Sequence, residues 1–108
     1  MLFNQKWDAK LRAEPWRQVL LHAADLIDRI GWCQHTECDD KGRVCAAEAL
    51  MRVAYATHDM ASTYSFAICR LSYFVTSGRQ SGAAIAWNDA EGRTAAEVTG
   101  AMRACAWQ

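Results

Sequence analysis

PWRQVLLHAADLIDRI, residues 15–30, has the clearest helical pattern in the chain. Its apolar residues recur with the 3.6-residue period of an α-helix, and polar residues fill the opposite side. The apolar positions are Trp16, Val19, Leu20, Ala23, Leu26, Ile27 and Ile30, and the polar ones are Arg17, Gln18, His22, Asp25, Asp28 and Arg29. Pro15 suits the first helical position, where its missing N–H costs nothing, and Gly31 provides a stop. The sequence therefore predicts an amphipathic helix over 15–30.

Further helices are predicted on the C-terminal side of this one. Residues 43–57 form a second helix, with a buried stripe of Val44, Ala47, Leu50, Met51, Ala54 and Tyr55. Residues 60–76 are rich in strand-forming residues, but apolar and polar positions do not alternate, so we predict a helix there. A short helix follows at 83–87. Thr94 and Glu97 have the spacing of a capping box, which starts the last helix.

We therefore predict an all-α fold, a small bundle of four to five helices in a single domain spanning 1–108. Residues 1–14 form an N-terminal leader segment, and Phe3, Trp7 and Leu11 give it an apolar face that can dock on the bundle.

The composition excludes several classes of protein. The chain has 12 basic and 12 acidic residues and a pI near 6.8, so nucleic acid is not an expected partner, because such binders usually carry a basic surplus. No apolar run approaches the roughly 20 residues of a membrane-spanning helix, and the first residues do not have the organisation of a signal peptide. We expect a cytoplasmic protein whose five cysteines, an odd number, stay reduced.

Three of the cysteines and one histidine gather in the loop between the first two predicted helices. Cys33, His35, Cys38 and Cys45 together offer four zinc ligands, which could form a structural site. Their spacing, C-x-H-x2-C-x6-C, matches no standard zinc motif. We therefore expect these side chains to pack in the loop without metal, and we assign no cofactor. A structural zinc site is the alternative.

Cys45 also suggests a nucleophilic thiol. It lies at the predicted start of a helix, where the helix dipole lowers the pKa of a thiol. His58 would be the base, oriented by Asp59 or Asn88, as in a Cys-His hydrolase. Cysteine is, however, among the most buried residue types, and this one begins an apolar stripe. We therefore expect a structural cysteine, and a protein that is not an enzyme.

Several short motifs resemble those of a bacterial, notably actinobacterial, and phage family whose domain has no assigned function. The motifs are Gly31-Trp32-Cys33-Gln34, Gly42-Arg43-Val44-Cys45, Ala49-Leu50 and Ala86-Trp87-Asn88-Asp89-Ala90-Glu91-Gly92-Arg93-Thr94-Ala95-Ala96-Glu97-Val98. The likeness runs from about Asp25 to the end of the chain. It implies a bacterial or phage origin, and it brings no activity with it.

Five tryptophans in 108 residues are many for so small a bundle. All lie near predicted helix ends or loops, so part of their surface could serve an interface. Trp32, Trp87 and Arg93 are the interface candidates, because Trp and Arg are typical hot-spot residues. The alternative is that Trp87, the Asn88-Asp89 pair and Arg93 brace the loop that leads into the last helix. The main hypothesis is a protein that acts by protein–protein interaction, with another protein or with itself as a homodimer, such as a phage or mobile-element accessory factor.

Overall fold

The computed structural model describes residues 5–57, 60–78 and 82–108, which form six helices. They are α1 (Gln5–Ala13), α2 (Pro15–Ile30), α3 (Ala46–Thr57), α4 (Met60–Val75), α5 (Ala84–Asn88) and α6 (Ala95–Ala106). Within these residues, extended pairing is limited to two isolated bridges that Val44 makes with Trp32 and with Cys38. The prediction of a small all-α bundle is confirmed.

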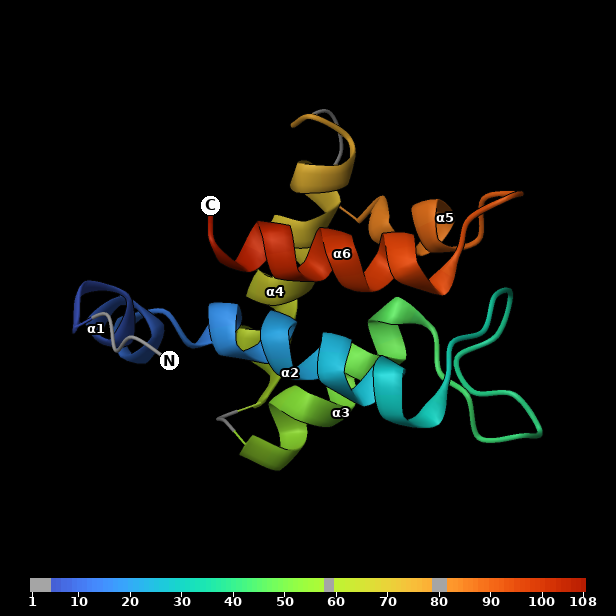
Figure 1. Ribbon diagram of the computed structural model, residues 1–108, viewed down its shortest axis with the longest axis horizontal. Coiled ribbons are helices and arrows are strands. Elements are labelled where there is room, and N and C mark those ends of the chain that lie inside the picture. Colours follow the sequence, from blue (N-terminus) through green and yellow to red (C-terminus); the bar gives the residue numbers. More distant parts are fainter. Residues whose placement is uncertain (1–4, 58–59, 79–81) are drawn as a thin grey trace.

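Helix α2 is the centre of the bundle. Figure 1 shows α6 lying beside α2 and running in the opposite direction, with α3 on the other side of α2 and α4 crossing behind. Helix α2 contacts α3, α4 and α6, and its contact with α6 is the most extensive in the molecule. The C-terminus and α1 lie at one end of the bundle, and the loop between α2 and α3 lies at the other.

The core is built from the apolar stripes of these helices. Its largest fully buried apolar side chains are Val19, Leu20, Val44, Leu50, Leu71, Val98 and Met102. The region predicted as helix despite its strand-forming residues is indeed helical, in α4. The capping box of α6 is also confirmed, because Thr94 accepts a hydrogen bond from the Glu97 N–H while the Glu97 carboxylate accepts one from the Thr94 N–H.

Arg17 corrects the predicted polar side of α2. Its side chain is only 2% exposed. The guanidinium donates hydrogen bonds to the carbonyl oxygens of Ala106 (2.8 Å) and Gln108 (2.7 Å) and pairs with Glu14 at 2.6 Å. It also lies over the ring of Trp16. The last carbonyls of a helix have no partner inside the helix, so Arg17 is buried because it satisfies the C-terminal end of α6.

Helix α3 departs from its prediction in two places. It begins at Ala46 rather than at residue 43, because the two preceding residues pair with the loop: the Cys33 N–H donates to the Val44 carbonyl, and the Cys45 N–H donates to the Glu37 carbonyl. Tyr55 was predicted in the buried stripe and is 54% exposed. Successive helical residues are about 100° apart, so Tyr55 lies at the outer edge of the stripe that ends at the buried Ala54.

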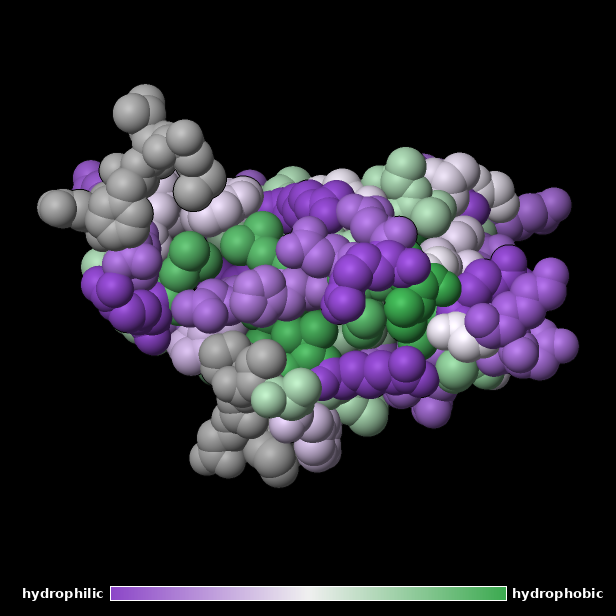
Figure 2. All heavy atoms as spheres, turned by 60° about the horizontal axis from the view of Figure 1, so that its bottom comes forward, coloured by the Kyte–Doolittle hydropathy of each residue, from purple (hydrophilic) through white to green (hydrophobic). Residues whose placement is uncertain are grey.

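One face of the bundle leaves apolar surface uncovered. A groove of about 360 Å³ between α2 and α3 is lined by His22, Leu26, Arg29, Arg52, Val53 and Ala56. Figure 2 shows this side of the molecule, where hydrophobic side chains lie between rows of hydrophilic ones.

Among the described helices, none combines the length and the apolar character that crossing a membrane requires.

Candidate functional site at the cysteine-bearing loop

The loop between α2 and α3 is held by its own turns. Gly31 ends α2 with φ +97°, and a Cβ at this position would lie 2.7 Å from the Arg43 side chain, so both the backbone conformation and the space require glycine. Asp39 organises the far turn. One of its oxygens accepts from the N–H groups of Lys41 and Arg43, and the other pairs with the Arg43 guanidinium at 2.5 Å. The loop is therefore a folded unit with defined side-chain positions.

Asn88, at the end of α5, connects this loop to the rest of the domain. The side chain is 1% exposed. Its oxygen accepts from the Trp32 indole N–H (2.7 Å) and from the Ala46 N–H (3.0 Å). Its amide nitrogen donates to the Cys33 carbonyl (3.2 Å) and to the Asp89 carboxylate (3.0 Å). One buried side chain thus joins the loop, the start of α3 and the end of α5.

The three predicted interface residues lie around Asn88 and make contacts inside the domain. Trp32 and Trp87 are partly buried and pack against the main core. The Arg93 guanidinium lies 4.3 Å from the centre of the Trp87 ring, donates to the Trp87 carbonyl and pairs with Glu97. These contacts hold Arg93 in the turn that leads into α6.

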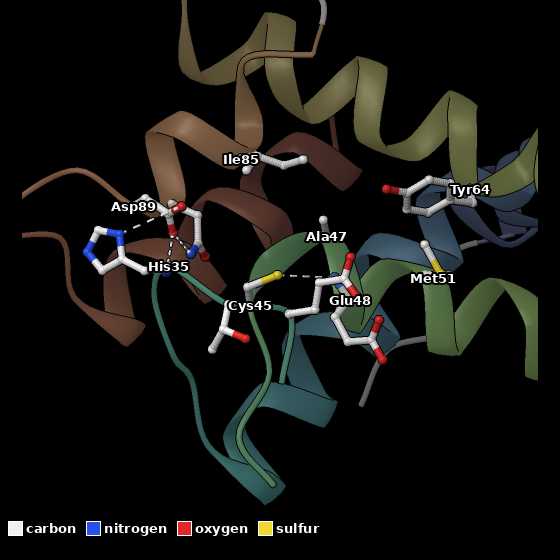
Figure 3. Close-up of a pocket in the computed structure, with 11 residues that line it drawn as sticks. His35, Cys45, Ala47, Glu48, Met51, Tyr64, Ile85 and Asp89 are labelled. Atoms are coloured by element: carbon white, nitrogen blue, oxygen red, sulfur yellow. Dashed lines mark hydrogen bonds and ion pairs between the residues drawn. The ribbon is translucent and has the colours of Figure 1, made fainter. Parts of the chain in front are cut away.

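The four proposed zinc ligands point to different partners. The Cys33 thiol is buried against the carbonyls of Thr36 and Arg43, whereas Cys38 is exposed beside the Asp39 carbonyl. Figure 3 shows the His35 ring pointing away from the Cys45 sulfur. Across the three described segments, no group of three or more His, Cys, Asp or Glu residues is placed to hold a metal ion.

Cys45 caps the start of α3 instead of presenting a thiolate. Its sulfur accepts a hydrogen bond from the Glu48 N–H at 3.4 Å, and its carbonyl accepts the first bond of the helix, from Ala49. Burial raises the pKa of the Cys45 thiol, an effect larger than the lowering by the N–H groups of Glu48 and Ala47. The proposed base His58 and its partner Asp59 lie outside the described residues.

A pocket of about 230 Å³ opens beside Cys45. Figure 3 shows that its walls come from the loop, from α3, from α4 and from α5 with the residue that follows it. The lining residues are His35, Thr36, Glu37, Cys45, Ala47, Glu48, Met51, Tyr64, Ile85, Asn88 and Asp89. The pocket lining therefore combines apolar side chains with several carboxylates, and it is the candidate functional site.

Asp89 fixes the mouth of this pocket. One carboxylate oxygen accepts from the His35 N–H at 2.8 Å, and the other lies 4.0 Å from the His35 ring nitrogen Nδ1. The bond from the His35 backbone holds the pKa of Asp89 below its usual range, and the bond from Asn88 adds to this effect. His35 itself has φ +67°, a conformation that non-glycine residues rarely adopt. The contact with Asp89 helps to hold this strained residue.

Sequence reasoning recognised the loop and the Asn88-Asp89 pair but missed the pocket. No local pattern assigns Glu37, Glu48 or Tyr64 to a pocket. The spacing of Glu48 predicts an ion pair with Arg52, which the structure contains, and the helical period predicts a core position for Tyr64. The pocket forms where segments that are far apart in the sequence come into contact, and the sequence alone does not show which segments do so.

Comparisons with known proteins give one family and no activity. No curated protein matches the chain, and no solved structure matches it. The sequence pattern of a family of unknown function (DUF6197) matches residues 12–108 and so covers α2 to α6, the loop and the pocket. The chain therefore belongs to this family of unknown function (DUF6197).

Proposed function

We propose that this protein is a cytoplasmic interaction domain that acts by binding another protein through the outer face of α4. The observation that carries the proposal is a pair of exposed aromatic residues on this face. Phe66 is 58% exposed and Tyr73 is 44% exposed. They are seven residues apart, which is two helical turns, so they point in the same direction. Large apolar side chains grouped on a surface are typical of interaction sites.

The composition of α4 supports this proposal. Arg70 is the only charged residue in the 16 residues of this helix, and its guanidinium lies over the Trp16 ring at 4.6 Å. A helix that simply faces water usually carries charges on its outer side. Helix α2 carries such charges: its exposed Asp25 and Asp28 both pair with Arg103 of α6.

The surface next to Phe66 is hollowed. A depression of about 300 Å³ is lined by Phe66, by Ser62 and Thr63 of α4 and by residues 13–16 at the junction of α1 and α2. An apolar side chain of a partner can enter such a depression while Phe66 packs beside it. Central, well-packed contacts of this kind supply most of the energy of an interface.

The alternatives have less support. Zinc and thiol hydrolysis each need a convergence of side chains, and the positions of Cys33, His35, Cys38 and Cys45 do not favour one. All five cysteines are free, as in a reducing compartment. A phage or mobile-element accessory factor fits the proposal, because such a factor acts by binding a host protein, and the α4 face is where we place that contact.

Sedimentation of the tagged protein in an extract of its own host tests the proposal. We expect the wild type to sediment as a complex larger than its 12.1 kDa mass, and the double variant Phe66→Ser/Tyr73→Ser to sediment as a free monomer. The matched control is His22→Ser/Arg29→Ser, which changes two exposed residues of α2 with the same seven-residue spacing and should leave the complex intact. The purified protein alone then shows whether the partner is a second copy.

A monomeric wild type in both the extract and the purified sample contradicts the proposal. A complex that survives the double substitution on α4 contradicts it as well.

A further inference from the structure

The size of the pocket beside Cys45 limits what it can hold. Its volume of about 230 Å³ lies below the roughly 300–1,000 Å³ of pockets that take drug-sized ligands. The apolar part of its lining is the buried Ala47 and the half-buried Met51 of α3, together with Ile85 of α5, which is 53% exposed. A single side chain, or a small molecule of similar size with an apolar stem, fits these dimensions.

The hydrogen-bond donors around the pocket are largely used inside the domain. The Asn88 amide nitrogen donates to Cys33 and Asp89, and its oxygen accepts from Trp32 and Ala46. At the start of α3, the Ala46 N–H donates to Asn88 and the Glu48 N–H donates to the Cys45 sulfur. These two N–H groups at the start of α3 are therefore already bonded within the protein, so they do not form an anion site in the pocket.

Carboxylates dominate the charge of the lining. Glu37, Glu48 and Asp89 all line the pocket, and within the described part of the chain no lysine or arginine does so. Arg52 pairs with one oxygen of Glu48 at 2.7 Å but is not a lining residue. A pocket lined by carboxylates attracts positively charged groups.

Tyr64 of α4 lines the same pocket as these carboxylates. Burial is the main cause that raises the pKa of Tyr64, and the nearby Cys45, Glu37 and Glu48 add to it. The ring of this lining residue offers a face for a cation.

We propose that this pocket binds a protonated amine or a guanidinium group carried on an apolar stem. The stem lies on Ala47, Met51 and Ile85, and the charged head pairs with Glu37 and Glu48 near the mouth formed by Asp89. Two sources share this chemistry: a lysine or arginine side chain of a bound protein, and a free small amine. The inference goes beyond the α4 interface and does not depend on it, because the pocket is a separate surface.

NMR titration of the ¹⁵N-labelled protein tests the inference with simple probes. We expect butylammonium and butylguanidinium to shift the amide signals of Ala47, Met51 and Ile85, and we expect butyrate and butanol at the same concentrations to leave them unchanged. A blocked glycine-lysine-glycine peptide distinguishes the two sources. Tighter binding of the peptide than of butylammonium indicates a protein side chain, and equal or weaker binding indicates a free amine.

Substitution of the carboxylates provides the decisive comparison. Glu37→Gln and the double variant Glu37→Gln/Glu48→Gln should weaken butylammonium binding about three- to tenfold, as expected for the loss of partly exposed charged partners. The matched control is Asp40→Asn/Glu91→Gln, which removes two exposed carboxylates that do not line the pocket. Glu37 is exposed, so the single variant reports on binding even if the double variant is less stable.

Three results overturn the inference. They are no response to either cation, an equal response to butyrate or butanol, and unchanged cation binding in Glu37→Gln.

Discussion

At the scale of single residues, Asn88 contributes most to the site. Its amide makes four hydrogen bonds to four different residues, and its own carbonyl accepts a further bond from Gln34. A buried polar group that loses its partner costs more than the hydrogen bond contributed, because the group stays away from water. Removing this one side chain leaves several such groups.

We predict that Asn88→Ala lowers the free energy of unfolding by about 3 kcal/mol, because the Trp32 N–H, the Ala46 N–H and the Cys33 carbonyl lose their partner. Urea unfolding followed by tryptophan fluorescence measures it. Asp40→Ala, at an exposed position in the same loop, is the control and should change stability by less than about 0.5 kcal/mol. A loss below 1 kcal/mol in Asn88→Ala would show that the loop does not depend on this residue.

The thiols should differ in reactivity according to burial. Cys33, Cys45 and Cys105 are buried, and burial raises the pKa of each, whereas Cys38 is exposed. Because the thiolate is the reactive form, we predict that iodoacetamide at pH 8 alkylates Cys38 first and reaches these three buried thiols only after unfolding. Peptide mass spectrometry over time measures the order. Rapid labelling of Cys45 in the folded protein would revive a nucleophilic role for it.

Cys105 should make stability depend on alkaline pH. Burial raises the pKa of Cys105 from 9.0 to about 11. The folded state therefore keeps this thiol protonated at pH values where the unfolded chain ionises. The contribution of this thiol to the free energy of unfolding is fully present below pH 9 and is lost as the pH rises from 9 to 11. We predict that Cys105→Ala reduces this fall by on the order of 2 kcal/mol, measured as the free energy of unfolding at pH 8 and pH 11. Equal falls in both proteins would refute the assignment.

Local signals made some residues predictable and left others hidden. Gly31 and Thr94 were predicted correctly because a helix stop and a capping box are written in neighbouring residues. Arg17 was placed wrongly, since its partners Ala106 and Gln108 lie about ninety positions away in the sequence. Local sequence shows that Arg17 is polar, and only the packing of α6 shows that it is buried.

At the scale of elements, the same distinction explains the two helix starts. Helix α6 begins where predicted because Thr94 and Glu97 satisfy its first N–H groups within one turn. Helix α3 begins later than predicted because Cys45, whose sulfur caps the helix, is itself fixed by pairing with Glu37 in the loop. A start set by backbone pairing across the loop cannot be recognised from helical spacing.

The capping box gives a prediction for α6. Thr94→Ala should lower the free energy of unfolding by about 1 kcal/mol, because the Glu97 N–H loses its acceptor. Thr94→Ser keeps the hydroxyl and should retain most of the stability. Thermal unfolding followed by circular dichroism compares the variants. If the alanine and serine variants melt together, the hydroxyl does not stabilise this helix.

At the scale of the whole molecule, the fold was predictable and the candidate sites were not. The amphipathic pattern of residues 15–30 identifies the helix on which α3, α4 and α6 all pack. The pocket beside Cys45 needs Glu48, Tyr64 and Asp89 from three separate parts of the chain. The exposure of Phe66 and Tyr73 likewise depends on which face of α4 the other helices cover. Periodicity shows that a helix has an apolar side, but not which apolar residues remain outside.

The proposed function requires α4 to contact another protein, and site-specific photo-crosslinking in intact host cells detects such a contact. A benzophenone amino acid placed at Phe66 or Tyr73 should give a discrete product heavier than the protein, and the same group placed at His22 or Arg29 of α2 should give none. The mass of the product separates a second copy of the chain from a different protein. If positions 66 and 73 yield no discrete product, or the same products as positions 22 and 29, the α4 face is not the site of contact and the account of function is wrong.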